Sequence, residues 1–414
     1  MWTDVPNLRH LRAFVLVAEM GGVTRAASRI HLSQPAITQA LAKLEERFST
    51  KLLEFGPEGM ALTTAGHLLR DRVERALALI ETGAREALRG EARRSGGGFA
   101  NFEQLITVAQ LRALAAMATT RNFSLAARDL GLSQPSVHRA ARDLERLTGM
   151  TMFVATRQGV DLTPGAEVFA RHAALAHAEL QQGFAEVSES LGRDPGQIVV
   201  GAMPFGRTKL LPDALNHLSR LRPLARVRVI SAPYDGLLGR LRYGVIDVLL
   251  GALRDPLPID DVVQEPLLDD PLAIVARADH PLISKPNVGY DDLLAYPWAV
   301  PGDDTPTRAV FHQMFPAEAE AKMPGGMIET SSLVLLRGVL AGSDRLTLLS
   351  ARQALYEIDQ GLLAVVPYPV SLGSRRIGLT YRRGWRPTAT QAILLDHLRS
   401  ARTIYEPTEE MDAL

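Results

Sequence analysis

Apolar residues recur at helical spacing in the first half of the chain, and the pattern repeats after 100 residues. After Ser133, the apolar positions Val137, Ala141 and Leu144 fall every three or four residues, which indicates the buried face of an α-helix. The stretch that starts at Ser133, SQPSVHRAARDLERLT, has a counterpart at Ser33, SQPAITQALAKLEERF. The flanking sequences match at the same offset, so we infer that a whole module has been duplicated without a gap.

Each copy predicts two short helices joined by a turn of a few residues. Ser133 is a suitable N-cap for the second helix, and Pro135 falls in its first turn, where proline is tolerated. We expect Ser124 to cap the preceding helix, with Thr24 doing so in the first copy. This helix-turn-helix pattern leaves polar side chains outward that can reach base edges in the DNA major groove. The alternative is a solvated amphipathic helix within a helical bundle.

From residue 196 onward the pattern changes to alternating strands and helices. The apolar runs QIVVGA, RVRVIS and IDVLLGAL are separated by helical segments, which predicts a parallel sheet. A second strand and helix series begins at PLAIVARADHPL, and the last strand, RRIGLTYRR, returns with its helix to the first series. We therefore expect two α/β lobes with a cleft that suits a small ligand.

The length of 414 residues fits two to four domains. Three consecutive glycines from Gly96 to Gly98 indicate a flexible tether between the copies. The predicted domains are residues 7–92 for the first copy, 93–101 for the tether, 102–192 for the second copy and 196–405 for the two-lobed region. We expect lobe I at about 196–269 and 370–405, and lobe II at about 270–369.

Composition and charge narrow the possible functions. Residues 1–100 hold 14 Lys or Arg against 11 Asp or Glu, and residues 101–195 hold 9 against 10, so neither copy is strongly basic, which counts against DNA binding. The absence of cysteine excludes disulfides and thiolate metal sites. No run approaches the roughly 18 apolar residues of a membrane span, so we expect a cytoplasmic protein. No catalytic motif, metal-ligand spacing or cofactor fingerprint is evident, and we expect neither enzyme activity nor a cofactor nor a metal.

The N-terminal winged helix-turn-helix of LysR-type transcriptional regulators is similar to two segments of this chain. The first is LRAFVLVAEMGGVTRAASRIHLSQPAITQALAKLE followed by LTTAG, and the second is LRALAAMATTRNFSLAARDLGLSQPSVHRAARDLERLTG followed by LTPGA. The region after residue 196 resembles the periplasmic-binding-protein-like effector domain of the same family, and within it the branch that includes regulators of sugar-binding-protein genes. The resemblance implies a multidomain α and α/β fold: two winged helix-turn-helix domains with linker helices, then a two-lobed effector domain. The implied function is sequence-specific DNA binding and transcriptional regulation under control of a small-molecule effector.

The resemblance implies DNA contacts from the second helix and the wing of each copy. Family members usually carry arginines in the wing, but the first copy has Glu54 and Glu58 there, while the second copy keeps Arg157. Each lost phosphate contact weakens DNA binding, so the second copy is the better candidate. The candidate DNA-binding residues are Ser33, Gln34, Pro35, Ala36, Thr38, Gln39 and Lys43 in the first copy, and Ser133, Gln134, Pro135, Ser136, His138, Arg139, Arg142 and Arg157 in the second.

Candidate effector contacts lie where loops lead into predicted helices of the two-lobed region. Helix N-termini offer unpaired N–H groups that suit a carboxylate or phosphate. Capping explains the Thr and Ser residues equally well, and surface ion pairs could explain the arginines. The candidates are Pro204, Phe205, Arg207, Thr208, Pro301, Thr305, Thr307, Arg308, Thr330 and Ser331. The expected effector is an organic carboxylate or a sugar-related metabolite.

Each copy ends in a long amphipathic pattern, which in the family forms a linker helix that pairs with its equivalent from another subunit. Two arrangements are open here: the two linker helices pair within one chain, or the first copy is a structural relic packed on the second. The resemblance implies double-stranded DNA, a homo-oligomer and RNA polymerase as partners, and no membrane. The competing hypothesis is a ligand-binding regulator that acts through protein contacts and has degenerate DNA-reading heads.

Overall fold

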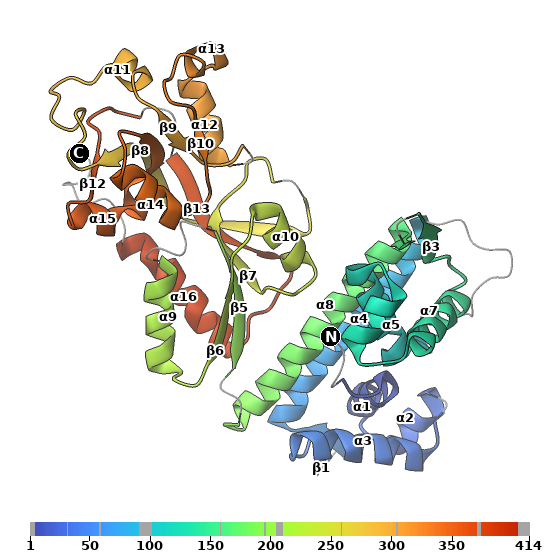
Figure 1. The fold of residues 1–414 in the computed structure, drawn as a ribbon. Helices are drawn as coiled ribbons and strands as arrows, with labels where there is room; N and C mark the ends of the chain where they lie inside the picture. The colour runs from blue at the N-terminus through green and yellow to red at the C-terminus, as the bar shows by residue number, and fades with distance from the viewer. Residues whose placement is uncertain are drawn as a thin grey trace. The chain divides into compact units, whose positions relative to one another are not determined.

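A computed structural model of the chain describes residues 5–404, apart from 31, 58, 91–101, 158, 194–195, 204–209, 258, 304 and 371–373. The chain divides into two compact units, residues 1–196 with 242–245 and residues 197–241 with 246–414. Figure 1 traces the two units in chain order from blue to red. The predicted tether at 93–101 lies outside the described residues.

The first unit contains two copies of one fold, each a helix-turn-helix followed by a hairpin and a long helix. The elements of the first copy are α1 (Leu8–Met20), α2 (Val23–Ile30), α3 (Gln34–Phe48), β1 (Leu53–Gly56), β2 (Gly59–Leu62) and α4 (Thr64–Gly90). Those of the second are η1 (Phe102–Gln104), α5 (Val108–Thr120), α6 (Phe123–Leu130), α7 (Gln134–Thr148), β3 (Phe153–Thr156), β4 (Gly159–Leu162) and α8 (Pro164–Ser190). The two antiparallel hairpins share the same register, so the predicted duplication of a winged fold is confirmed.

The second helix of each helix-turn-helix, α3 or α7, is called its recognition helix, and both begin as the sequence predicts. The hydroxyl oxygen of Ser33 accepts a hydrogen bond from the backbone N–H of Ala36 at 3.4 Å, and Ser133 accepts one from Ser136 at the same distance. Each cap satisfies a backbone donor that the first helical turn would otherwise leave without a partner. The proline of each Ser-Gln-Pro sits in that first turn.

The caps predicted for the preceding helices are wrong. Helix α6 is capped by Asn122, whose Oδ1 accepts from the backbone N–H groups of Ser124 and Leu125 at 2.8 and 3.1 Å. Helix α2 already starts at Val23, one residue before Thr24. Helix α6 starts earlier than predicted because the amide oxygen of Asn122, two residues ahead of Ser124, accepts from the backbone N–H groups of the first helical turn.

A single apolar core runs through the first unit and joins the two copies. It contains the inward faces of the recognition helices, with Ile37 and Leu44 in α3 and Val137 and Leu144 in α7. Each of these side chains is at most 1% exposed. The same core includes the facing sides of α4 and α8, which lie side by side (Figure 1). Since the cores are shared, neither copy is an independently packed domain.

The second unit is built on one mixed sheet. Its first elements are β5 (Gln197–Ala202), α9 (Leu210–Leu221), β6 (Arg226–Ile230), α10 (Tyr234–Arg242), β7 (Val248–Ala252) and β8 (Val262–Arg277). Then follow α11 (Tyr290–Leu294), β9 (Trp298–Val300), α12 (Pro306–Met314), α13 (Ala317–Glu320), β10 (Ile328–Glu329), α14 (Leu333–Ala341), β11 (Leu346–Ser350) and η3 (Ala351–Gln353). The last elements are α15 (Leu355–Asp359), β12 (Leu363–Val365), β13 (Ser374–Arg382) and α16 (Ala389–Ile404).

Strands β5, β6 and β7 are parallel, as predicted, and β9 pairs in parallel with β10 and β11. Strand β13 returns to the first lobe, where it pairs antiparallel with β7, and this prediction is also confirmed. Strand β8 starts nine residues before the predicted start at Pro271 and runs from one lobe into the other. Its acidic residues Glu265 and Asp270 obscured the strand pattern, and both are ion-paired, with Arg399 and Arg375.

Each lobe has its own apolar core. The first lobe buries residues of β5, β7 and β13 against α9 and α16. The second lobe buries an aromatic cluster in which Trp298 lies 5.2 Å from Phe311 and 5.0 Å from Phe315, measured between ring centroids. Two cores joined by β8 and β13 confirm the two-lobed α/β fold.

Candidate DNA-reading helices and effector cavity

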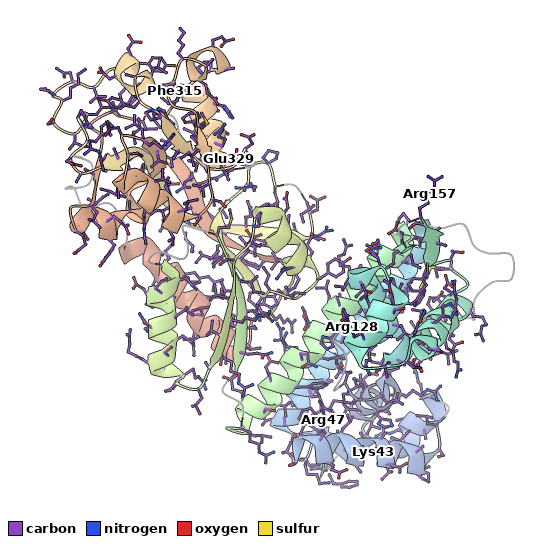
Figure 2. All side chains as sticks on the ribbon, in the orientation of Figure 1. Lys43, Arg47, Arg128, Arg157, Phe315 and Glu329 are labelled. Atoms are coloured by element: carbon purple, nitrogen blue, oxygen red, sulfur yellow. The ribbon has the colours of Figure 1, made fainter. Side chains whose placement is uncertain are left out.

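Helices α3 and α7 present the predicted polar residues to solvent, because their apolar faces are held in the shared core. Ala36 is half-buried. The remaining candidates are exposed: Ser33, Gln34, Pro35, Thr38, Gln39, Lys43, Ser133, Gln134, Pro135, Ser136, His138, Arg139, Arg142 and Arg157. Figure 2 shows Lys43 on α3 and Arg157 at the end of the β3–β4 hairpin.

The two arginines of α7 differ in what they contact. Within the described part of the chain, Arg139 forms no hydrogen bond or ion pair. Arg142 pairs with Glu145 at 2.5 Å between Nη1 and Oε2, and that carboxylate is buried and accepts hydrogen bonds from the backbone of Met152 and Phe153. Arg142 therefore has a structural role as the counter-charge of a buried carboxylate, whereas the Arg139 guanidinium is available to a ligand.

In the first copy, a different residue provides the counter-charge of the equivalent carboxylate. Glu45, the counterpart of Glu145, accepts from the backbone N–H of Leu52 at 3.1 Å and pairs with Lys51 at 2.6 Å. Ala42 stands where the second copy has Arg142. The recognition surface of α3 thus lacks this cation, and Glu45 is still paired.

Two further predicted DNA contacts, His138 and Arg157, differ in their surroundings. His138 packs edge-on against Phe123 of α6, with ring centroids 5.0 Å apart. Arg157 extends from the turn of the second wing, while the first wing carries the exposed residues Glu54 and Phe55, the latter 89% exposed. The second wing can therefore contact phosphate with a cation, and the first wing presents an apolar ring and a negative charge.

Helices α4 and α8 pair antiparallel with approximate twofold symmetry. A Cβ atom added at Gly83 would lie 2.3 Å from Cβ of His172, and one added at Gly183 would lie 2.7 Å from Cβ of Arg72. These two contacts are equivalent, because Gly83 and Gly183 are 100 positions apart, and so are Arg72 and His172. Glycine at both positions allows the two helix backbones to approach closely. Of the two arrangements left open by the sequence, pairing of the linker helices within one chain is the one observed.

A buried ion cluster crosses this helix pair on one side. Arg72 donates to both carboxylate oxygens of Glu186 at 2.9 and 2.6 Å, to Glu179 at 2.9 Å and to Gln182 at 2.8 Å. Arg75 donates to both oxygens of Glu179 at 3.1 and 3.0 Å. Burial acts to raise the pKa of Glu179, but the hydrogen bonds from Arg75 and Arg72 outweigh it and lower the pKa. Glu179 is therefore ionised at neutral pH.

The far end of α8 supports the first head. Phe184 contacts Phe48 with ring centroids 5.6 Å apart, and the guanidinium of Arg47 lies 5.0 Å from the Phe184 ring centroid. At the C-terminus of α3, Arg193 donates to the backbone oxygens of Phe48 and Ser49 at 2.5 and 3.4 Å. The position of α3 is thus set by the second linker helix as well as by its own copy.

The second unit has a cavity of about 1180 Å³ lined by residues of both lobes. It adjoins a smaller cavity of about 110 Å³. Of the predicted effector contacts, Thr305, Thr330 and Ser331 line both cavities, and Pro301 and Thr307 line the smaller one. The candidates Pro204, Phe205, Arg207 and Thr208 lie outside the described residues.

Capping occupies some of these hydroxyl groups. The Thr305 hydroxyl accepts from the backbone N–H of Arg308 at 3.1 Å, and Thr330 accepts from that of Ser332 at 3.0 Å. Within the described chain, the hydroxyl of Ser331 forms no hydrogen bond. Ser331 is therefore the predicted hydroxyl best placed to bind a ligand.

Three arginines that line the large cavity escaped the sequence prediction. The guanidinium of Arg254 lies 4.3 Å from the ring centroid of Tyr234, Arg337 pairs with Glu357 at 2.6 Å, and Arg352 donates to the backbone oxygen of Asp269 at 3.3 Å. They come from three separate segments, so no local motif brings them together. Glu329 and Asp359 also line the cavity, which leaves an excess of one positive charge among these lining residues (Figure 2 labels Glu329).

A buried ion pair lies beside the small cavity. Arg375 lines it and pairs with Asp270 at 2.5 Å, while donating to the hydroxyl of Thr307 at 2.9 Å and to Gln353 at 3.3 Å. Ser350 donates to the other oxygen of Asp270. Burial raises the pKa of Asp270, although Arg375 acts against this shift. The hydroxyl of Thr307 is thus engaged with Arg375.

Arg308 lines neither cavity. Its side chain is buried in the second lobe, where it pairs with Asp303 at 3.1 Å and lies against the ring of Phe311, with the guanidinium carbon 5.3 Å from the centroid. Its Nε also donates to His312 at 3.0 Å. For Arg308, the ion-pair alternative describes the observed position, and effector contact is not supported.

Residues 191–403 match the family model of the LysR substrate binding domain, and residues 8–67 and 108–167 each match that of the bacterial regulatory helix-turn-helix proteins of the lysR family. The chain belongs to the LysR family. It is a sequence-specific DNA-binding transcriptional regulator with an effector-binding domain. Among the described residues, no helix is long and apolar enough to cross a membrane, and no cluster of side chains is suited to hold a metal ion.

Relatives within the LysR family differ in how much of this chain they match. The HTH-type transcriptional regulator GalR of Pseudomonas putida is 33% identical over 97% of this chain and 98% of its own length. The HTH-type transcriptional regulator PcaQ of Agrobacterium fabrum is 28% identical over 72% of this chain and 96% of its own. The structure of a full-length OxyR variant from Pseudomonas aeruginosa shares the fold, with a TM-score of 0.50 and 23% identity over 71% of this chain and 95% of its own.

Proposed function

We propose that α7 is the principal base-reading helix and that α3 reads a second half-site. The observation that carries this proposal is the exposed, unengaged guanidinium of Arg139 on a helix that buries its opposite face. Arginine donates two hydrogen bonds to guanine in the major groove, and glutamine, as at Gln39 in α3, pairs in the same way with adenine. Arg157 in the wing supports α7 with a phosphate contact.

A mobility shift assay with the full chain tests this proposal. The DNA probes are genomic fragments that flank the gene of this protein. Arg139→Ala should weaken specific binding roughly 5- to 100-fold, the equivalent of one lost base contact. Arg157→Ala should weaken binding to all sequences alike and reduce the salt slope by about 1. Arg85→Ala, on the exposed side of α4, serves as the control and should leave binding unchanged.

Arg142→Ala is not an informative variant, because it removes the counter-charge of buried Glu145 and would disturb folding. If the wild-type chain bound no DNA specifically, the competing hypothesis of a regulator that acts through protein contacts would take its place. The exposed Phe55 of the first wing would then be the natural surface to examine.

We further propose that the effector is a small organic carboxylate bound in the large cavity. Arg254 and Arg352 provide cationic groups on the lining, Arg337 is paired with Glu357, and Ser331 provides a free hydroxyl beside the N-terminus of α14. Calorimetric titration with a panel of carboxylates and neutral sugars tests this inference. Binding of neutral sugars without binding of carboxylates would contradict it.

Effector control then requires that the ligand bind one arrangement of the two lobes better than another. We propose that lobe closure alters how the linker helices hold the heads, which would appear as a changed footprint on adding effector. An unchanged footprint and DNA bend would refute this coupling. Function in the cytoplasm, association into oligomers and contact with RNA polymerase complete the proposal.

A further inference from the structure

We propose that one chain reads an operator made of two unlike half-sites, because the α4–α8 pair holds one copy of each head and disfavours two copies of the same head. This inference rests on the proposed DNA reading by α3 and α7. It concerns the partner DNA, which would have no palindromic symmetry.

The contact geometry of the α4–α8 interface is symmetric, but its charges are not. The pair Arg72 and Glu186 has a counterpart in His172 and Glu86, whose atoms Nε2 and Oε2 lie 3.6 Å apart. The buried Glu179 has Leu79 as its counterpart. The strong ion cluster therefore exists once in the interface instead of twice.

The consequence appears when α8 is placed against α8 of a second copy in the same geometry. Glu179 would then face His172 and Leu175, which are the counterparts of Arg72 and Arg75. Both guanidinium groups would be lost while the carboxylate stayed buried. A buried carboxylate without its ion-pair partner is strongly unfavourable, so α8 disfavours a second α8.

The reverse pairing, α4 against α4, is also poorly matched. Arg72 would keep a carboxylate at Glu86, but Leu79 and Thr82 would replace Glu179 and Gln182 as its other neighbours. Only the combination of α4 with α8 satisfies every member of the cluster. The charge pattern therefore selects a reader with one α3 and one α7.

The two recognition helices present different chemistry at equivalent exposed positions. Thr38 and Gln39 in α3 stand where α7 has His138 and Arg139. Glutamine favours adenine and arginine favours guanine, so these helices specify different bases. Both helices have the same length and the same offset from their linker helices. The two half-sites should therefore have the same length but different sequences.

Selection of bound sequences from a random duplex library by the full-length protein tests the inference. We expect two different half-sites separated by about one helical turn. Arg139→Gln should change base preference in one half only, and Gln39→Arg in the other half only. Arg85→Gln, on exposed α4, should leave both halves unchanged.

A palindromic site whose two halves both change with Arg139→Gln, while Gln39→Arg is silent, would overturn the inference, because two copies of the second head would be reading the DNA. A single half-site read by α7 alone would overturn it as well. Failure to enrich any sequence would instead refute the proposed DNA reading.

The single-chain pairing has its own test, which the absence of cysteine makes clean. Glu86→Cys with His172→Cys places two thiols, away from the ion cluster, on residues whose longer side chains now meet at 3.6 Å. Treatment with a short bismaleimide should give an internally cross-linked monomer on a denaturing gel. A covalent dimer as the main product would show that the heads are paired between chains and would overturn this part of the inference.

Discussion

Removal of the Arg72 side chain should destabilise the first unit by about 3 kcal/mol. The side chain is 5% exposed and holds two carboxylates and an amide of α8. Breaking a buried ion pair at one partner typically costs about 3–5 kcal/mol. We expect the lower end, because Glu179 keeps both hydrogen bonds from Arg75 and Glu186 is 16% exposed.

The assay is urea unfolding of the full chain, followed by circular dichroism and by tryptophan fluorescence. Trp298 and Trp385 both lie in the second unit, and Trp2→Phe removes the third tryptophan from the signal. Helices of both units contribute to the dichroism signal, so Arg72→Ala should shift the first unit's part of that transition to lower urea and leave the fluorescence transition in place. Its double-mutant cycle with Glu179→Leu should give a coupling energy of about 1 kcal/mol or more.

Arg85→Ala is the matched control. Arg85 also lies on α4 and pairs with Glu81, but its side chain is 63% exposed, so its loss should cost about 0–1 kcal/mol. Equal effects of Arg72→Ala and Arg85→Ala would refute the argument that burial makes this cluster important. So would a shift of the fluorescence transition as large as that of the dichroism transition.

Three further predictions concern separate sites. Burial lowers the pKa of His177 from 6.5 to about 4. The contribution of neutral His177 to stability is therefore complete above pH 6.5 and is lost as pH falls toward 4. His177→Leu should flatten the pH dependence of the unfolding free energy in that window, by roughly 3 kcal/mol in total. Gly83→Ala should lower the melting temperature by dichroism, because the added Cβ would lie 2.3 Å from Cβ of His172; a raised melting temperature would show that the helices can separate at no cost. Arg375→Met should lower the urea midpoint of the tryptophan transition, since it leaves Asp270 buried without its counter-charge, and an unchanged midpoint would contradict that role.

Local pattern was enough to predict the duplicated heads. The spacing from Val137 to Leu144 and the Ser133 cap depend on residues within a few positions of each other, and both are confirmed. The two-lobed fold followed from strand and helix alternation, although Glu265 and Asp270 concealed the first half of β8. Helix α6 started earlier than predicted because its cap is Asn122, two residues ahead of Ser124.

The interactions that define the interfaces and the cavity could not be predicted, because they join residues far apart in the chain. Arg72 and Glu179 are 107 positions apart, and each alone looks like a charge on an amphipathic helix. The cavity arginines Arg254 and Arg352 have no shared motif. Arg142 was predicted to face DNA from its position on α7, but its pairing with Glu145 depends on that carboxylate being buried.

The pairing of α4 with α8 inside one polypeptide changes how the regulator responds to dilution. A reader assembled from two subunits falls apart by mass action when its concentration drops below its dissociation constant. Two segments joined in one chain meet at an effective concentration that does not depend on the amount of protein present. A cell that holds only a few molecules of this regulator would therefore still hold complete two-headed readers, and DNA occupancy would follow protein abundance linearly where a dissociating dimer gives a quadratic dependence.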